Sequence, residues 1–395
     1  MTDRELFYRH LGLPSFTPMG LEIIHAEGVW LTGSDGTRYM DLVSGISVSN
    51  IGHRHAKVLA AISEQLEKYL HLNVYGEFVQ SPQVMLAKRL TDLLPSSLDS
   101  VYFVNSGSEA IEGAMKLAKR YTGRQEVIAF YNAYHGSTHG ALSILGNEKM
   151  KNAFRPLIPD IRFLRFNNFH DLDGITDKTA CVFAETIQAE AGLILPEENF
   201  LVKLRRRCTE TGTLLIIDDV QMGFGRTGTL FSFEQYGIIP DVLVLAKALG
   251  AGMPLGVFIA AKQVMNMLAY DPELGHITTF GGHPVSCAAA LAGIEVLLTG
   301  DLISQVESKG KLIEDKLAGH NAIRSWRRKG LALGLDLLDP GKRNHFMKTA
   351  LENGIIIDWY LFQPATFRIA PPLTITIQEI EESCRRVRRA LEEII

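Results

Sequence analysis

Five short apolar runs in the middle of the chain constrain its fold most strongly. Each run is continuous and is bounded by polar residues or glycine. Such runs are typical of strands buried on both faces, as in a parallel sheet. Segments with helical periodicity, such as Glu109–Tyr121 and Phe200–Thr211, lie between the runs, and this alternation predicts an α/β fold. The five runs are Val101–Val104, Val127–Phe130, Cys181–Ala184, Leu214–Ile217 and Val242–Ala246.

The two ends of the chain have a different pattern. Residues 22–42 form a hairpin-like pattern whose turn is Gly33–Gly36. The C-terminal part reads as helix, strands and a final charged helix over Gln378–Ile395. We therefore predict a large domain over residues 51–295. A smaller domain would combine an N-terminal segment, residues 1–50, with residues 296–395.

Charge and composition exclude some classes of partner. Hydrophobic residues make up 46% of the 395 residues, which allows a large core. The net charge is −4, whereas nucleic acids and anionic membrane surfaces attract a basic excess. We therefore expect no nucleic-acid or membrane partner, while small anionic substrates remain compatible with a locally basic site.

Cysteine usage and the N-terminus predict a cytoplasmic protein. The four cysteines lie far apart and form no CxxC pair, which is typical of a reducing compartment. The N-terminal residues contain no apolar segment of the kind that directs secretion. The stretch Val242–Ala261 has about the length of a membrane span, but it contains Lys247, three glycines and Pro254. A buried strand, a glycine-rich turn and a second buried strand explain it better.

Two charged residues at predicted strand ends are candidates for chemistry, because ligands of open parallel sheets bind at the carboxyl ends of the strands. Lys247 directly follows an apolar strand. Partial burial there would lower its pKa and make it a nucleophile toward carbonyl groups; the alternative is an amine that reaches solvent. Asp218 ends another strand, and its poorly hydrated carboxylate would need a cationic partner such as a pyridinium N–H. The alternative for Asp218 is a helix cap or a salt bridge.

The loop Asn105–Glu109 follows the first apolar run and opens a helix. Exposed N–H groups and the helix dipole at such a position favour a phosphate, and Gly107 allows the anion to approach closely. Ser106 and Glu109 also fit a capping box. Both readings can hold together, and Ser108 remains as a phosphate ligand.

Three other patterns are weak. Gly223–Gly228 satisfies GxGxxG, but five residues separate it from the strand and no good helix start follows, so an NAD site is not favoured. His135 and His139 have the spacing of metal ligands without a third ligand, and we predict no metal site. The pair His53 and His55 is more typical of a structural role.

In their order along the chain, these segments resemble the class III aminotransferases, the family of ornithine, acetylornithine and 4-aminobutyrate aminotransferases. The resemblance runs over nearly the whole chain, from Gly45-Ile46 and Gly52-His53 to Arg368. It implies an α/β protein of PLP-transferase fold type I, in which a large domain has a mostly parallel seven-stranded sheet and a smaller domain is α+β. The matching segments are NSGSEAIEGAMKLAK (105–119), YHG (134–136), ETIQAEAG (185–192), IIDDVQMGFGRTG (216–228), PDVLVLAKALGAGMPLG (240–256), HITTFGGHP (276–284) and FRIAPPLTIT (367–376).

The resemblance implies that most of the site residues bind the cofactor pyridoxal 5′-phosphate (PLP). Lys247 would bind it covalently, and Asp218 would pair with its pyridinium nitrogen. The phosphate would lie against Ser106, Gly107 and Ser108. The other contacts would come from Tyr134 and Val220 on the two ring faces, His135, Gln221 at the phenolic oxygen, and Thr279 of a neighbouring subunit, which makes the functional unit at least a homodimer.

The resemblance also implies a substrate site. Arg368 would bind the α-carboxylate of amino and oxo acids, and Glu190 would pair with Arg368 when an ω-amino donor is bound. Ile46 and Ser137 would lie in the same site, where many relatives carry a tyrosine and an arginine. Three further departures lie in or near the pocket, namely Thr186 for proline, Asp219 for glutamate and His283 for asparagine.

The implied reaction is a ping-pong transamination from an ω-amino donor, such as ornithine, acetylornithine or 4-aminobutyrate, to an α-oxo acid such as 2-oxoglutarate or pyruvate. Lys247 would act as the general base, with burial keeping its pKa usable. Alternatives are a PLP-dependent aminomutase or decarboxylase of the same family, an NAD-dependent oxidoreductase, and a binding protein without a cofactor.

Overall fold

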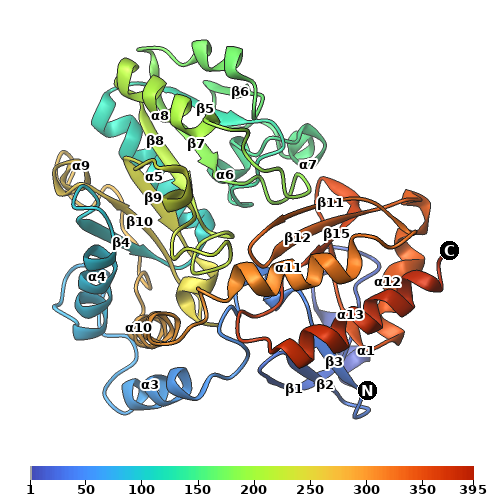
Figure 1. The fold of residues 1–395 in the computed structure, drawn as a ribbon. Helices are drawn as coiled ribbons and strands as arrows, with labels where there is room; N and C mark the ends of the chain where they lie inside the picture. The colour runs from blue at the N-terminus through green and yellow to red at the C-terminus, as the bar shows by residue number, and fades with distance from the viewer. Residues whose placement is uncertain (1) are drawn as a thin grey trace.

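A twisted seven-stranded sheet forms the centre of the larger part of the molecule (Figure 1). The computed structural model describes residues 2–395. Five strands of this sheet are parallel neighbours, and β10 lies antiparallel between β4 and β9. The predicted mostly parallel sheet is therefore confirmed. In sheet order the strands are β4 (Ser100–Val104), β10 (Gly256–Ala260), β9 (Val242–Leu245), β8 (Leu214–Asp218), β7 (Thr179–Glu185), β5 (Glu126–Phe130) and β6 (Ile161–Leu164).

The apolar runs form strands for the reason that their composition indicates. Every residue of β7, β8, β9 and β10 is buried, because helices and loops cover both faces of the sheet. All five predicted strands are present. The sequence did not indicate β6, which is short and carries Arg162. The glycine-rich turn after β9 leads into β10, so Val242–Ala261 is two strands, and no helix among residues 2–395 is long and apolar enough to cross a membrane.

Helices connect the strands of this sheet and pack on it. The helix α5 (Gly107–Thr122) follows β4 and packs on β9 and β10. The helix α8 (Phe200–Thr211) has the predicted bounds and leads into β8. The other helices of this part are α3 (Ala56–Leu66), α4 (Ser81–Leu93), α6 (His139–Ser143), α7 (Glu148–Lys151), α9 (Lys262–Met265) and α10 (Pro284–Thr299).

Two smaller sheets lie beside the large one (Figure 1). The first contains β1 (Ile23–Glu27), β2 (Trp30–Gly33), β3 (Arg38–Asp41) and β13 (Ile355–Ile356), so the N-terminal hairpin pairs with a strand from the C-terminal part. The second contains β11 (Ile323–Lys329), β12 (Ala332–Leu337), β15 (Gln363–Ile369) and β14 (Asp358–Tyr360). The helices here are α1 (Asp3–His10), α2 (Ser44–Ser47), α11 (Val306–Leu317), α12 (Arg343–Glu352) and α13 (Ile377–Glu392). The domain boundaries at residues 50 and 295 stay a prediction.

Candidate active site

A cavity of about 520 Å³ opens at the carboxyl edge of the seven-stranded sheet. Residues that follow β4, β5, β8 and β9, together with Glu185 at the end of β7, contribute to its wall, as expected for an open α/β sheet. Its lining includes ten residues of special interest: Ser106, Gly107, Ser108, Tyr134, His135, Glu185, Asp218, Val220, Gln221 and Lys247. Of the residues predicted to bind the cofactor, only Thr279 is not in this lining.

The N-terminus of α5 forms one end of the cavity. Ser106 is the N-cap, and its hydroxyl accepts the backbone N–H of Glu109 at 3.2 Å. The predicted capping box is only half formed, because the Glu109 carboxylate accepts the backbone and side-chain N–H groups of Asn105 instead. The unpaired N–H groups of the first helical turn therefore remain available to an anion.

Two glycines allow the chain to come close at this helix end. A Cβ atom at Gly107 would lie 3.2 Å from Val220, and a Cβ atom at Gly136 would lie 2.0 Å from the Ser108 hydroxyl. The loop of Gly136 thereby packs directly against the start of α5, where the Ser137 N–H donates to the Ser108 hydroxyl at 3.2 Å. The result is a narrow cup lined by backbone N–H groups and a serine hydroxyl.

Asp218 lies at the end of β8 with a cationic partner at hand. His135 Nδ1 is 2.7 Å from its Oδ2 atom, and the Val220 N–H donates to Oδ1 at 3.1 Å. Burial disfavours protonated His135, but its hydrogen bond to Asp218 and the charges of Asp218 and Glu185 outweigh burial and raise the pKa of His135. The other ring nitrogen of His135 is buried without a partner in the described residues.

Glu185 lies beside Asp218 at the end of the neighbouring strand. Burial raises the pKa of Glu185 to about 7, His135 opposes this shift, and Asp218 adds to it. The carboxylate accepts the backbone N–H groups of Tyr134 and Ala189. Glu185 thus ties the Tyr134 loop to the loop that follows β7.

Lys247 occupies a strained backbone position at the end of β9. Its φ angle is +49°, in the left-handed region that side chains with a Cβ atom rarely adopt. Burial is the largest influence on its amine and lowers the pKa of Lys247; Glu190 opposes this shift and the positive charge of Arg368 adds to it. No hydrogen bond to the amine occurs within residues 2–395. A lysine held in this way is a nucleophile toward carbonyl compounds.

A buried ion pair links the cavity wall to the second small sheet through Gln221, and neither of its members, Arg368 and Glu190, is in the lining itself. Arg368, on β15, donates from Nη2 to Glu190 Oε1 at 2.6 Å, and Gln221 donates to the same oxygen at 3.0 Å. The guanidinium lies over the ring of Tyr360 at 4.5 Å. Arg368 Nε and Nη1 are buried without partners in the described part of the chain. The arginine therefore has donors left over for a further anion.

The other predicted substrate residues lie differently. The Tyr134 hydroxyl is 3.2 Å from the Ser137 hydroxyl; Ser137 is exposed and is not in the lining, although Tyr134 and Gly136 are. Ile46 is half-buried in α2 and is not in the lining, whereas Val48, two residues later, is. Thr279 is exposed, while its neighbour Thr278 accepts a hydrogen bond from Asn105 at 3.2 Å.

The patterns judged weak from the sequence have structural roles. His139 is 2.8 Å from the Pro156 carbonyl, and His53 is 2.8 Å from Asp41. His55 caps α3. Residues 223–228 form turns rather than the start of a helix. No group of three potential metal ligands occurs among residues 2–395.

The comparison with protein families decides the identity of this arrangement. The family model of "Aminotransferase class-III" matches residues 14–391.

The chain belongs to the class III aminotransferases.

Curated relatives agree with this assignment. Acetylornithine aminotransferase of Methanocaldococcus jannaschii is 37% identical over 94% of this chain and 94% of its own length. The [LysW]-aminoadipate semialdehyde/glutamate semialdehyde transaminase of Sulfurisphaera tokodaii is 35% identical over 95% of both chains. Among solved structures, an ornithine aminotransferase from Toxoplasma gondii, described with PLP at its active site, superimposes with a TM-score of 0.92 at 26% identity and covers 99% of this chain and 94% of its own.

This class III aminotransferase is a PLP-dependent transaminase of fold type I. Three features of the cavity fit the cofactor. The cup at the start of α5 suits a phosphate, the Lys247 amine suits the cofactor's carbonyl carbon, and the buried Asp218 carboxylate suits a protonated ring nitrogen. A cavity of about 520 Å³ has room for the cofactor and part of a substrate.

Two groups of residues in this class III site were not predicted from the sequence. Val48, Met222, Met253, Pro254 and Leu255 line the cavity, but only Met253–Leu255 carried a signal, their place in the glycine-rich turn after Lys247. Ser232 was also missed. Its N–H donates to the buried Asp219 carboxylate at 2.8 Å, and its hydroxyl bonds to both Asp219 and Thr186. It thus connects two of the positions where this chain departs from the family pattern.

Proposed function

We propose that this class III aminotransferase moves an amino group from an ω-amino donor to an α-oxo acid, and that the Arg368–Glu190 pair lets one site accept both. The observation that carries the proposal is the state of Arg368. One of its amino groups is held by Glu190, and its Nε and Nη1 donors are buried without partners within residues 2–395. Nη2 has a second N–H besides the one that it gives to Glu190, and together with its neighbour on that side, Nε or Nη1, it forms a pair of parallel donors that matches the two oxygens of a carboxylate.

The pair solves a charge problem between two kinds of substrate. An ω-amino donor has no carboxylate on its reacting carbon, so an unpaired guanidinium would be a buried charge without compensation. Glu190 compensates it in the arrangement seen here. An α-oxo acid brings its own carboxylate, and Glu190 then turns away. The Gln221 amide, which already donates to Glu190, holds the carboxylate in the closed arrangement.

The roles of the remaining residues follow from their positions. PLP, when bound, supplies a carbonyl carbon that accepts amino groups and a ring that accepts the electron pair left by a lost proton. Lys247 provides the amine that holds the cofactor and then carries a proton, since its lowered pKa favours the neutral base. Asp218, fixed by His135, keeps the ring nitrogen protonated. Ser106, Gly107 and Ser108 bind phosphate, while Tyr134, Val220 and Gln221 orient the ring.

Two observations indicate the class of amino donor: the names of the curated relatives, and the positions at which this chain differs from the family pattern. The relatives in Methanocaldococcus and Sulfurisphaera are named for acetylornithine and for the semialdehydes of aminoadipate and glutamate. Acetylornithine carries a terminal amine, and each semialdehyde carries the terminal aldehyde that such an amine becomes on transamination. We carry over this class of terminal amines alone. Ser137 and Ile46 replace the arginine and tyrosine that the resemblance leads us to expect, so the far end of the donor is bound differently here.

The active unit in this proposal is a cytoplasmic homodimer or a larger assembly. Thr279 is exposed on the single chain and is not in the lining of its own cavity, which suits a residue that completes the phosphate site of a neighbour. The four cysteines are buried and unpaired, as is usual for a reducing compartment.

Two variants test the proposed role of the Arg368–Glu190 pair. Arg368→Lys keeps the charge but loses the planar fork, so kcat/KM for α-oxo acids should fall about 100-fold while use of simple ω-amines changes less than about threefold. Glu190→Gln removes the negative partner, so preference should shift about tenfold from ω-amines toward α-amino acids.

The assay is a donor panel of ornithine, N-acetylornithine, lysine, 4-aminobutyrate and β-alanine with pyruvate or 2-oxoglutarate. Absorbance of the cofactor reports the amino half-reaction separately, and one equivalent of aminated cofactor per site distinguishes transamination from mutase or decarboxylase chemistry. Unchanged KM values for every substrate in Arg368→Lys would exclude the proposed role.

A further inference from the structure

The turn α2 has a backbone conformation that L-amino acids rarely adopt. Ser44, Gly45, Ile46 and Ser47 have φ angles of +48°, +61°, +60° and +60°. Only one of the four is glycine, so Cβ atoms crowd the backbone at the other three. Such a run persists only where surrounding contacts fix it, and strained backbone of this kind clusters at functional sites.

Hydrogen bonds from Asp41 and within the turn hold its ends. Asp41 Oδ1 accepts the N–H groups of Val43 and Ser44, both at 2.8 Å. The Ser44 carbonyl accepts the N–H group of Val48 at 2.8 Å. Val48, at the far end of the turn, lines the cofactor cavity. The position of the cavity wall is therefore set by the conformation of α2.

Arg226 binds the same turn through the Ser44 hydroxyl. It is fully buried, and its Nη2 donates to the Ser44 hydroxyl at 3.0 Å and to Asn50 Oδ1 at 2.6 Å. Its Nη1 donates to the carbonyls of Leu331 and Pro371 at 3.0 and 2.6 Å. All four acceptors are neutral. Burying a cation without a carboxylate in contact is costly, so its retention points to a geometric role that the planar guanidinium fulfils.

The contacts of Ser44 and Arg226 extend to the strand that carries Arg368. The Ser44 hydroxyl donates to the Ala370 carbonyl at 2.7 Å, and the Ala370 N–H donates to the Leu42 carbonyl at 2.6 Å. Ala370 directly follows β15, and Arg226 binds the next residue, Pro371. The strained turn and the segment that follows Arg368 are thus bonded to one another and to one buried guanidinium.

We propose that Arg226 is a positioning residue that locks the α2 turn to the end of β15, so that the Val48 wall and the Arg368 guanidinium keep a fixed separation. Arg226 itself does not line the cavity, and the proposed chemistry does not use it. The inference rests on the proposed role of Arg368 in binding carboxylates. It makes the fit of the substrate's carboxylate depend on an arginine outside the site.

Arg226→Met tests this positioning, because methionine fills most of the space but bonds to none of the four oxygens. In the holoenzyme, the KM for pyruvate should rise about tenfold while kcat stays within about threefold. Propionate carries a carboxylate but no oxo or amino group. Its dissociation constant, measured by calorimetry on the same holoenzyme, should rise by the same factor.

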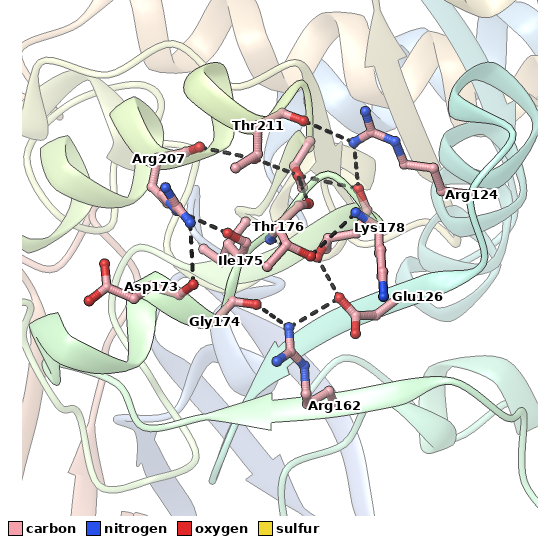
Figure 2. Close-up of polar contacts among 12 residues, drawn as sticks. Arg124, Glu126, Arg162, Asp173, Gly174, Ile175, Thr176, Lys178, Arg207 and Thr211 are labelled. Atoms are coloured by element: carbon pink, nitrogen blue, oxygen red, sulfur yellow. Dashed lines mark hydrogen bonds and ion pairs between the residues drawn. The ribbon is translucent and has the colours of Figure 1, made fainter.

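Arg124→Met is the matched control. Arg124 also binds only neutral oxygens, the carbonyls of Thr179, Thr211 and Gly212, and it lies at the opposite edge of the sheet (Figure 2). Its replacement should lower the melting temperature and leave both the KM for pyruvate and the propionate affinity unchanged. A purely structural Arg226 would give this same result, and that outcome would overturn the proposal.

Ser44→Ala removes one node of the network and leaves the arginine in place. We expect about threefold weaker propionate binding, and this variant decides the question alone if Arg226→Met does not fold. Arg368→Lys separates the two proposals. Normal propionate affinity in Arg368→Lys would refute both the proposed function and this inference. If Arg368→Lys binds propionate weakly but Ser44→Ala and Arg226→Met bind it with wild-type affinity, only this inference is refuted.

Ser47 offers a readout of the strain that does not depend on activity. Glycine adopts positive φ without a steric penalty, whereas a β-branched residue does not. Ser47→Gly should keep or raise the melting temperature, and Ser47→Val should lower it and weaken propionate binding. The opposite order would show that the left-handed turn is absent in solution, which would remove the basis of the proposal.

Discussion

The two edges of the seven-stranded sheet both carry charged groups, partly buried at the amino edge and buried at the carboxyl edge, but they use them in opposite ways. At the amino edge, Arg124, Arg162 and Arg207 donate to backbone carbonyls and to Glu126, as Figure 2 shows. Glu126 in turn accepts from Arg162 at 3.1 Å and from the Thr179 hydroxyl at 2.5 Å. These contacts join the starts of β5, β6 and β7. Charge at this edge therefore stabilises the fold.

At the carboxyl edge, and on the neighbouring strand β15 that carries Arg368, charged groups retain hydrogen-bonding capacity. The Lys247 amine has no hydrogen bond within residues 2–395, and among these residues His135 Nε2 and two nitrogens of Arg368 are also unpartnered. Buried polar groups are normally satisfied, so a cluster of unsatisfied ones marks a place where a ligand supplies the missing partner. Arg162 Nε at the amino edge is also buried without a partner among residues 2–395, so one leftover donor does not mark a site. The carboxyl side differs because several such groups gather close to one cavity.

Replacing one lysine at each edge should give the largest difference in activity between the two edges. Lys247→Ala removes the amine that holds the cofactor and carries the proton, so kcat should fall by at least about 10⁴-fold. Lys178→Ala, an exposed lysine at the amino edge, should retain wild-type kcat. Borohydride reduction followed by peptide mapping checks the attachment independently. Turnover near the wild-type rate in Lys247→Ala would remove the lysine from the mechanism.

The fold of the central sheet was predictable because its signal is local. Runs such as Leu214–Ile217 and Val242–Ala246 are continuous, apolar and of strand length, and both became fully buried strands. The strand β6 was not predicted because Arg162 interrupts its apolar run. The antiparallel direction of β10 was not stated because strand direction depends on the length of the preceding connection and on the neighbours that it finds.

The candidate site was predictable where a local pattern marks the end of a strand, as in the loop Asn105–Glu109, most of which lines the cavity. Lys247 and Asp218 are read directly from the sequence, and both line the cavity. The partnership of Asp218 with His135 joins residues far apart in sequence, and no local pattern indicates it. The left-handed turn at Ser44–Ser47 was equally hidden, since serine and isoleucine do not favour positive φ and tertiary contacts impose it.

The two edges also differ in how a carboxyl group at each of them should affect the pH dependence of stability. Glu126 is paired with an arginine, whereas Asp219 bonds to Ser232, whose N–H and hydroxyl are neutral. Burial of Asp219 raises its pKa from 3.8 to about 7, although the Ser232 bonds oppose the shift. The folded state therefore holds this proton more tightly than the unfolded chain. Its stabilising contribution is complete below about pH 4 and is lost as the pH rises through about 7.

Asp219→Asn should flatten the pH dependence of stability in that window. The free energy of unfolding of the wild type should fall between about pH 5 and about pH 8 by on the order of 1–4 kcal/mol more than that of the variant. Urea unfolding of the PLP-saturated enzyme at several pH values measures the difference, with Glu126→Gln as the control at the other edge. Parallel pH profiles for wild type and Asp219→Asn would mean that Asp219 is ionised in the folded protein throughout.

The smallest expected effect concerns the amino edge alone. Arg124 Nη1 binds three carbonyls that belong to the start of β7 and to the end of α8. Arg124→Met leaves these carbonyls without a donor, but the arginine is only partly buried, so water can replace it in part. The free energy of unfolding should fall by about 1–2 kcal/mol, with kcat and KM unchanged for every substrate. A loss of activity without a loss of stability would contradict the division between the two edges, because an arginine saturated by carbonyls far from the cavity would then be acting on the chemistry.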